Sequence, residues 1–416
     1  MTFTFGTEVC RAAFDGGSTP WISFGLRYFE ATRQHCQDAF CCLKVYIICS
    51  RSIAQNTDAL DRLRSALGDR VAGVRIGINP HTPLSQVLEV VHDAEKREAD
   101  CLVTLGAGSL TDTAKIVRLA LANSARSMED LDTLWGTAES NPRFRNKVHR
   151  PTIPLIHIPT SLSGGEYQAI AGATEPQSQA KRTFHCEGVN PELVIQDPEL
   201  CLTTPQWVWL STGIRAVDHC VETLCSLRSN EKGDACSRRA LPKLISGLLQ
   251  SMADPSSLDA RHLCQQGVVD AMAAVSSGVP LGASHAIGHQ LGPLGVGHGE
   301  TSCILLPSVC NFNLKMKANI DRQAAVRDLL LEQSEVWVIL NARNDLSPTT
   351  SSLGDVLDAI ISALRMPRSL EDVGVGIDKI PTLAKNSLDD IWIRTNAFPI
   401  TREEHVRDIL ATCLRR

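Results

Sequence analysis

The sequence predicts an α/β domain with a parallel, Rossmann-like sheet, followed by an all-α domain. In the first half, short apolar runs of strand length alternate with amphipathic helical patterns, which is typical of a doubly wound parallel sheet. After about Thr204, strand-like runs become rare and long helical patterns take over. We therefore expect an N-terminal extension over residues 1–21, a nucleotide-binding domain over 22–204 and a helical domain over 205–416.

The expected strands of the first half are short and rich in apolar and β-branched residues, as in a sheet buried on both faces. The first twenty residues show no clear period and are interpreted as an irregular extension or an edge hairpin. Strands are expected over 22–25, 44–50, 71–78, 100–105, 154–159 and 193–196, and helices over 28–40, 56–67 and 84–97.

Helical spacing of apolar residues dominates the second half. The expected helices cover 207–226, 232–252, 258–276, 279–291, 353–364 and 402–414.

Composition and charge exclude several classes of protein. A net charge of −5 gives no reason to expect nucleic acid or a membrane surface as a partner. No apolar run reaches the ~18 residues of a spanning helix, and the first residues do not resemble a signal peptide. The 15 cysteines include no Cys-x-x-Cys pair. We expect reduced thiols in a cytoplasmic protein.

A glycine-containing loop follows the expected strand 100–105. Gly106, Ala107, Gly108 and Ser109 lead into a helix, so backbone N–H groups and the helix N-terminus could receive a phosphate. Ser109 and Asp112 have the spacing of a capping box. The loop is neither Gly-x-Gly-x-x-Gly nor a Walker loop, and alone it could be only a tight turn.

Further candidate cofactor-binding residues follow other strands. The turn after strand 154–159 offers the hydroxyls of Thr160, Ser161 and Ser163, although it could be an ordinary solvated loop. Ser50 and Arg51 end the strand 44–50, where a hydroxyl and a guanidinium suit a 2′-phosphate and favour NADP(H) over NAD(H). The candidate set is completed by two basic residues, Lys181 and Arg182.

The segment from Gly278 to Pro307 contains three histidines, His285, His289 and His298. The first two are four residues apart and share one face of an expected helix. The third follows a glycine-rich turn that could bring it back beside that face. A histidine on an apolar helix face is more often a core residue than a catalyst. The three histidines therefore indicate a functional site only together with the motifs around them.

Several blocks together resemble the iron-containing (group III) alcohol dehydrogenase superfamily, especially its maleylacetate reductase branch. They are GAGSLTDTAK (106–115), IPTSLSGGEYQAIAGATE (158–175), DPEL (197–200), STGIRAVDHCVETLCS (211–226), GASHAIGHQLG (282–292), GHGETSCILLP (297–307) and NAFPIT (396–401). The resemblance runs from about Ile22 to the C-terminus. It implies hydride transfer between a nicotinamide and a small-molecule substrate in a cleft between two domains, and it allows a homodimer.

Metal-dependent members of that superfamily hold a divalent ion with one aspartate and three histidines. The resemblance places the histidines at His219, His285 and His298, but the aspartate position is Arg215. A guanidinium there would repel an ion by several kcal/mol at an effective dielectric of ~20. Asp218 is expected to point about 100° away from His219 and so not to replace the lost ligand. We therefore expect no metal.

Without a metal, Arg215 could stabilise a developing alkoxide or enolate, or bind a substrate carboxylate. His219, His285 and His298 would surround the same substrate, and His289 is the expected proton donor. Glu222 is expected to orient His219 or to balance Arg215, and Arg215 could instead be only a buried ion-pair partner.

The favoured function is a metal-independent, NAD(P)H-dependent reductase of a small, anionic carbonyl or enol compound. A non-redox lyase, dehydratase or cyclase on the same scaffold and a metal-dependent alcohol dehydrogenase are the alternatives. A binding protein without catalysis is the least favoured.

Overall fold

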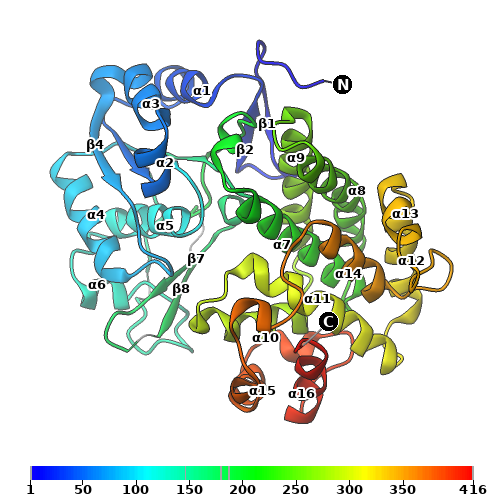
Figure 1. Cartoon of the computed structure of the whole chain (residues 1–416). Coiled ribbons are helices and arrows are strands. Elements are labelled where there is room, and N and C mark those ends of the chain that lie inside the picture. Colours follow the sequence, from blue (N-terminus) through cyan, green and yellow to red (C-terminus); the bar gives the residue numbers. More distant parts are fainter. Residues whose placement is uncertain (1, 146, 179, 186–187, 415–416) are drawn as a thin grey trace. The chain divides into compact units, whose positions relative to one another are not determined.

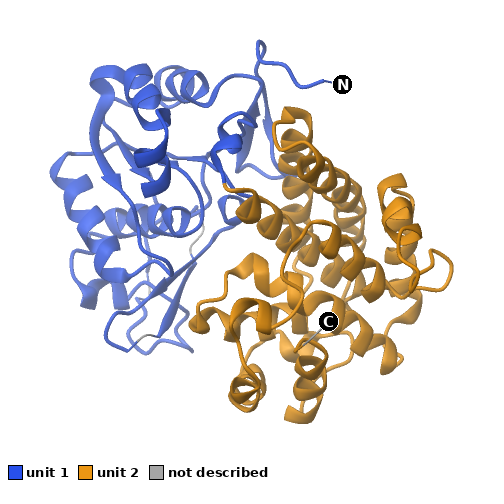
Figure 2. Cartoon of the chain, viewed as in Figure 1, with its two compact units in different colours: residues 1–204 blue, residues 205–416 orange. Residues whose placement is uncertain are grey.

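The computed structural model describes residues 2–145, 147–178, 180–185 and 188–414. The chain forms two compact units, residues 1–204 and residues 205–416 (Figure 2). Each unit has its own secondary structure, and each is described by itself.

A seven-stranded sheet forms the centre of the first unit (Figure 1). Its strand order is β1-β2-β9-β6-β5-β3-β4, and every pairing except that of β1 with β2 is parallel. The predicted α/β class with a parallel sheet is therefore confirmed. The strands are β1 (Val9–Ala12), β2 (Trp21–Phe24), β3 (Val45–Cys49), β4 (Val71–Ile76), β5 (Cys101–Leu105), β6 (Leu155–Ile158) and β9 (Leu193–Ile195).

Helices cover both faces of this sheet because its central strands are apolar on both sides. In β3, Tyr46 and Ile48 pack with helices α4 (Leu84–Lys96) and α5 (Ser109–Ala122). The alternate residues Val45 and Ile47 pack on the other face with helices α1 (Tyr28–Gln34) and α3 (Ala59–Leu67). This alternation gives the first unit two apolar cores, one on each side of the sheet.

The remaining elements of the first unit are short. They are α1 (Tyr28–Gln34), α2 (Arg51–Asn56), α3 (Ala59–Leu67) and α6 (Met128–Asp132), the π-helix η1 (His35–Ala39), the 3-10 helices η2 (Gly68–Arg70), η3 (Gly165–Tyr167) and η4 (Leu200–Thr203), and the antiparallel pair β7 (Ile170–Thr174) and β8 (Lys181–His185).

Some sequence-predicted bounds in the first unit are wrong. The helix expected over 28–40 is α-helical only to Gln34 and continues as the π-helix η1. The helix expected from residue 56 begins at Ala59, because α2 precedes it and ends at Asn56. Of the two interpretations of the first twenty residues, the structure has the edge hairpin, formed by β1 and β2.

The second unit is helical and contains no strand among its described residues. Its helices are α7 (Gln206–Cys225), α8 (Glu231–Ala253), α9 (Leu258–Val275), α10 (Ala283–Leu291), α11 (His298–Lys315), α12 (Ile320–Leu331), α13 (Ser334–Asn341), α14 (Leu353–Ala363), α15 (Ile380–Ser387) and α16 (Glu403–Thr412), with 3-10 turns η5 (Gly292–Leu294), η6 (Glu371–Val373), η7 (Ile377–Lys379) and η8 (Ile393–Thr395).

Helix α10 starts at Ala283 rather than at Val279 as expected, because Gly282 has an extended backbone and is its N-cap. Helix α11 was not expected from the sequence. It packs against both α7 and α10, and all three carry candidate site residues.

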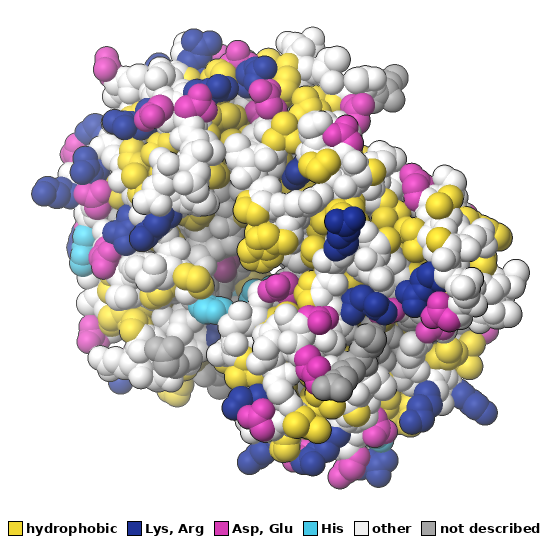
Figure 3. Space-filling view, in the orientation of Figure 1, with side chains coloured by type: hydrophobic (Ala, Val, Ile, Leu, Met, Phe, Trp, Pro, Cys, Tyr) yellow, Lys and Arg dark blue, Asp and Glu magenta, His cyan; other side chains and the backbone are white. Residues whose placement is uncertain are grey.

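No helix in the described part of the chain is long and apolar enough to cross a membrane. On the face drawn in Figure 3, acidic and basic side chains of the described residues are interspersed within each unit. Neither unit therefore presents a patch of a single charge on that face.

Candidate functional site

The glycine loop of the first unit lies at the carboxyl end of β5, beside the end of β3. A Cβ at Gly106 would lie 2.9 Å from Ser50 Cβ and 2.7 Å from Leu110 Cδ1, so only glycine fits there without displacement. Ser50 in turn is the N-cap of α2 and accepts a hydrogen bond from the Ile53 N–H at 3.3 Å. The N-termini of α2 and α5 therefore lie at the carboxyl ends of two neighbouring strands, β3 and β5.

Gly108 is the N-cap of α5, with φ +67°, a conformation that favours glycine. No atom lies within 4 Å of a Cβ built at this position. Glycine is therefore favoured here by its backbone conformation and not by lack of space. The capping box expected from Ser109 and Asp112 is wrong, because Ser109 is already the first helical residue. The first N–H groups of a helix have no partner within the helix, and such helix starts are common phosphate-binding sites.

Polar side chains of α5 contact the segment that follows β6. Lys115 is buried and donates to the carbonyl oxygens of Gly165 at 2.6 Å and Ile170 at 2.9 Å. Thr111 donates to Glu166 Oε1 at 3.2 Å. Lys115 therefore positions the turn after β6 against α5, and burial lowers the pKa of its ammonium.

Buried carboxyl groups accompany Lys115. Burial raises the pKa of Asp112 and of Glu166, while the nearby Lys115 acts in the opposite direction. Neighbouring His157, on β6, shares a 2.7 Å hydrogen bond with Thr104, on β5. The sequence-based reasoning missed this polar core beneath the two turns.

The predicted hydroxyl-bearing turn has the expected position after β6. The hydroxyls of Ser161 and Ser163 lie 3.1 Å apart, and the carbonyl of Thr160 accepts a 2.7 Å hydrogen bond from Thr204. The side chains of both serines are only partly buried. The turn is therefore anchored by its backbone and keeps its hydroxyls near the surface.

The basic candidates of the first unit are dispersed. Arg51 is exposed, and its side chain lies beside Gly77, which follows β4; a Cβ there would be 3.1 Å from Arg51 Nε. Lys181 is exposed on β8 and lies close enough to Asp112 to lower its pKa. Arg182 stacks on Trp135, with its guanidinium carbon 4.3 Å from the ring centroid. The ring of Trp135 is therefore the packing partner of Arg182.

In the second unit, helix α7 presents four charged or titratable residues on one face. Arg215, Asp218, His219 and Glu222 follow the i, i+3, i+4, i+7 spacing of a helical stripe, and all four are buried. Asp218 is expected to point about 100° away from His219, and in the structure its carboxylate nevertheless lies 3.5 Å from His285 Nδ1, beside the other members of the stripe.

Helix α10 meets this stripe through His285. The imidazole Nδ1 lies 2.8 Å from Glu222 Oε2 and 3.5 Å from Asp218 Oδ2. The rings of His285 and His219 are stacked, with centroids 4.7 Å apart. Glu222 also accepts the N–H groups of Gly282 at 2.7 Å and Ser284 at 2.8 Å. Glu222 therefore orients His285 and the start of α10, whereas the sequence suggested His219 or Arg215 as its partner.

His289 and His298 lie together at one side of the cluster. Their ring centroids are 6.4 Å apart, and His289 also packs on Trp392 at 5.3 Å. Asp390 Oδ2 lies 2.8 Å from His289 Nδ1, which orients the ring. His289 is partly buried and His298 is exposed. Trp392 additionally contacts His285 edge-on at 5.8 Å, so one indole joins the two histidines of α10.

Serines from α10 and α11 complete the surroundings of Asp218. Ser284 and Ser302 donate to Asp218 Oδ2 at 2.8 Å and 2.6 Å. Arg215 Nη1 lies 3.3 Å from the Ser302 hydroxyl, and no described carboxylate lies within ion-pair distance of its guanidinium. Asp390, Trp392, Ser284 and Ser302 were missed from the sequence, because nothing in their local pattern distinguishes them from ordinary helix and turn residues.

Burial determines the charges in this cluster. It lowers the pKa of His219 to about 3 and that of His285 well below its usual value, and Arg215 adds to both effects. Burial also raises the pKa of Asp218 to about 6 and that of Glu222 to about 8. Both imidazoles are therefore neutral near pH 7, and Arg215 is the fixed cation of the cluster.

The donors do not fit the divalent ion that the family resemblance implies. The expected aspartate position carries the Arg215 guanidinium, which opposes an ion electrostatically. Ligand-type atoms of Asp218, Glu222 and His285 do lie within 4.8 Å of one another. These atoms already share hydrogen bonds: His285 Nδ1 with Glu222, and Asp218 Oδ2 with two serine hydroxyls. Asp218 Oδ2, Glu222 Oε2 and His285 Nδ1 therefore have hydrogen-bond partners, and the guanidinium of Arg215 is the feature that opposes an ion here.

Three buried polar atoms in the cluster make no hydrogen bond to the described protein residues. They are Asp218 Oδ1, His219 Nδ1 and His285 Nε2. Buried polar groups are normally satisfied, so unpaired ones beside a cation indicate a place for a polar ligand. The cluster thus combines one fixed cation with neutral imidazoles that can donate or accept hydrogen bonds.

Known proteins with similar sequences cover both units. Residues 20–198 match the family described as iron-containing alcohol dehydrogenase, and residues 209–414 match the C-terminal part of that family. The chain is 36% identical to dehydrogenase FUM7 of Gibberella moniliformis, over 94% of this chain and 95% of the relative. It is 28% identical to the NAD-dependent methanol dehydrogenase of Bacillus methanolicus, over 79% and 82% of the two chains.

Solved structures show the same fold. The crystal structure of maleylacetate reductase from Agrobacterium tumefaciens matches with a TM-score of 0.70 and 24% identity, covering 100% of this chain and 98% of the other. The family resemblance inferred from the motifs is confirmed. The chain belongs to the iron-containing alcohol dehydrogenase family, and it is an oxidoreductase.

Proposed function

We propose that this oxidoreductase uses NADPH or NADH to reduce a small anionic carbonyl or enol compound, and that it does so without a catalytic metal. The observation that supports this proposal is Arg215. Its guanidinium is buried, stands where the family has a metal-binding aspartate, and has no described carboxylate within ion-pair distance. A buried cation of this kind is stabilised by an anionic ligand.

The nicotinamide cofactor is supported by family membership and by the NAD-dependence of the methanol dehydrogenase to which the chain is similar. The N-terminus of α5 and the open loop at Gly108 suit the cofactor diphosphate. The exposed Arg51, at the next strand end, suits a 2′-phosphate and favours NADPH. When bound, the cofactor would supply the hydride.

Arg215 acts on the substrate in this proposal. Its guanidinium binds the substrate carboxylate or stabilises the negative charge that develops on the carbonyl oxygen. Neutral His219 and His285 hydrogen-bond the substrate through their unpaired ring nitrogens, His219 Nδ1 and His285 Nε2. They assist by orientation rather than by charge.

His289 supplies the proton that completes the reduction. Its Nδ1 is held by Asp390, which leaves Nε2 as the atom that would deliver a proton to the substrate oxygen. His298, next to His289, is exposed and is proposed to line the substrate side of the cluster.

Two alternatives remain testable. A metal-dependent alcohol dehydrogenase is favoured by the family, and a non-redox lyase, dehydratase or cyclase would use the same arginine and histidines for acid–base chemistry. Free cysteines among the described residues are compatible with a cytoplasmic enzyme.

The experiment that tests the proposal is a titration of the purified protein with NADPH and NADH, followed by nicotinamide fluorescence and metal analysis. We expect saturable binding of at least one cofactor, and then its oxidation by small 2-oxo or 3-oxo acids but not by matched uncharged ketones. Absence of binding at millimolar cofactor would favour the non-redox alternative. One tightly bound iron or zinc per chain, required for turnover, would favour the metal-dependent one.

A further inference from the structure

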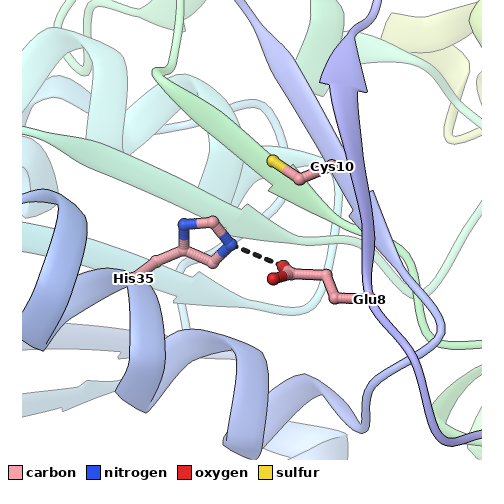
Figure 4. A group of neighbouring side chains, drawn as sticks. All are labelled: Glu8, Cys10 and His35. Carbon is pink, nitrogen blue, oxygen red and sulfur yellow. Dashed lines mark hydrogen bonds and ion pairs between the residues drawn. The ribbon is translucent and has the colours of Figure 1, made fainter.

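A second cluster of metal-ligating residues lies in the first unit, at the N-terminal hairpin. Glu8 and Cys10 come from the hairpin, and His35 comes from η1 (Figure 4). Glu8 Oε1 lies 2.6 Å from His35 Nε2, and one ligand-type atom from each residue lies within 4.8 Å of the other two. None of the three belongs to the glycine loop or to the histidine cluster.

Local structure explains how these three residues meet. Glu8 directly precedes β1, which contains Cys10, and residues two apart along a strand direction point to the same side, so both extend toward one face of the hairpin. The π-helix η1 follows the end of α1 directly and begins at His35. π-helical turns are rare and frequently occur at functional sites. Figure 4 shows the imidazole directed at the Glu8 carboxylate.

We propose that Glu8, Cys10 and His35 form a zinc site with three protein ligands. Thiolate, imidazole and carboxylate are the ligand types that Zn²⁺ takes in proteins, and three of them leave a fourth position for water. A thiolate ligand disfavours Mg²⁺ and Ca²⁺, which prefer oxygen atoms. Binding releases the thiol proton of Cys10 and any proton shared by Glu8 and His35.

The surroundings of Glu8, Cys10 and His35 favour a bound metal ion. Glu8 is already oriented by Ser23, whose hydroxyl lies 2.5 Å from Oε1, and by Gln34, whose amide lies 3.0 Å from Oε2. The side chains of Glu8 and His35 are only 14% and 12% exposed, whereas Cys10 is exposed. Preoriented ligands with outer hydrogen bonds are typical of metal sites. The exposed thiol gives an ion a path of entry.

A bound ion would have a structural consequence. β1 is the edge strand of the sheet and, among the strands of the described residues, pairs with β2 alone. A ligand set that joins β1 to η1 would fasten this edge to the helical layer, stabilising the folded hairpin in proportion to ion concentration. The family match begins at residue 20, so two of the three ligands lie outside the matched region.

The test is a cobalt titration of the full chain, because Co²⁺ replaces Zn²⁺ and reports thiolate ligation by near-ultraviolet charge-transfer absorption. We expect a sulfur-to-cobalt band that saturates near one ion per chain and is displaced by Zn²⁺. The band should be lost in Cys10→Ala and in His35→Ala. It should remain in Cys41→Ala, since Cys41 is the other exposed cysteine among the described residues.

A second measurement uses the unmodified protein. Zn²⁺ should slow alkylation of Cys10 by iodoacetamide several-fold in the unmodified protein, with Cys41 as the internal comparison. His285→Ala should behave like the unmodified protein in both experiments, because that residue lies in the other unit. A charge-transfer band unchanged in Cys10→Ala, no band at all, or equal alkylation with and without Zn²⁺ would each overturn the proposal.

Discussion

Glu222 Oε2 lies 2.8 Å from His285 Nδ1, although the two residues are 63 positions apart in the sequence. The same carboxyl group accepts the N–H groups of Gly282 and Ser284 at the start of α10. One side chain of α7 therefore fixes both the ring orientation of His285 and the first turn of its helix. This contact joins the two sequence motifs that carry the candidate site.

Glu222 should make the stability of the protein depend on pH. Burial raises its folded-state pKa to about 8, above the usual value of about 4.3 for a glutamate in an unfolded chain. Between these values the folded protein keeps a proton that the unfolded chain loses. The free energy of unfolding that this bound proton contributes is therefore lost as pH rises, at up to about 1.4 kcal/mol per pH unit.

We expect Glu222→Gln to flatten the fall in unfolding free energy between pH 5 and pH 8, since the amide does not titrate. Urea unfolding at several pH values measures this slope. Glu129→Gln, which changes an exposed glutamate of α6, is the control and should leave the slope as it is. Identical slopes for the unmodified protein and Glu222→Gln would show that Glu222 is already ionised throughout this range.

The fold could be predicted from the sequence because its signals are local. Strands β3 and β5 are continuous apolar runs, and the long helices of the second unit have regular apolar spacing. The limits of those helices were less accurate. α10 begins four residues later than expected because Gly282 is extended, and η1 replaces the end of the first helix.

The site could be predicted only in part, because its geometry depends on three helices. Sequence spacing places His219 near Arg215 and His285 near His289. It does not show that Asp218 faces Ser284 and Ser302, or that Asp390 holds His289. Those partners are 66, 84 and 101 positions away from the residues that they contact. No periodic pattern links such distant positions.

Gly108→Ala should weaken cofactor binding more than it destabilises the protein. The substitution strains a residue with φ +67° but meets no atom within 4 Å. We expect a stability loss of about 1 kcal/mol and a roughly tenfold or greater rise in the Kd for NADPH, because the N–H groups of the loop shift. Fluorescence titration and urea unfolding measure the two effects.

Gly374→Ala is the matched control, because Gly374 has φ +74° and equally open surroundings in the other unit. It should cost similar stability and leave the Kd for NADPH unchanged. Equal cofactor affinity in the two variants would argue against phosphate binding at the Gly108 loop.

Arg51→Ala should change the choice between cofactors. If this guanidinium contacts the 2′-phosphate, its removal should raise the Kd for NADPH by about tenfold, a loss of about 1.4 kcal/mol, and leave the Kd for NADH nearly unchanged. Arg64→Ala, on the exposed face of α3, is the control. A parallel loss for both cofactors would place Arg51 outside the 2′-phosphate site.

Arg215→Asp should convert the proposed anion-binding site into a metal-binding site. The variant replaces the buried guanidinium by the carboxylate that metal-dependent relatives use, next to His219 and His285. We expect it to gain affinity for Zn²⁺ or Fe²⁺, which metal analysis after dialysis measures. We also expect the rate of reduction of anionic substrates to fall by about 10²–10³-fold, because the fixed cation is lost.

Arg215→Asn separates the effects: it should lose the reduction without gaining the metal, since it removes the cation but supplies no anionic ligand. One tightly bound ion per chain in the unmodified protein, as in Arg215→Asp, would contradict the metal-free proposal. Full reduction by Arg215→Asn would remove Arg215 from the mechanism.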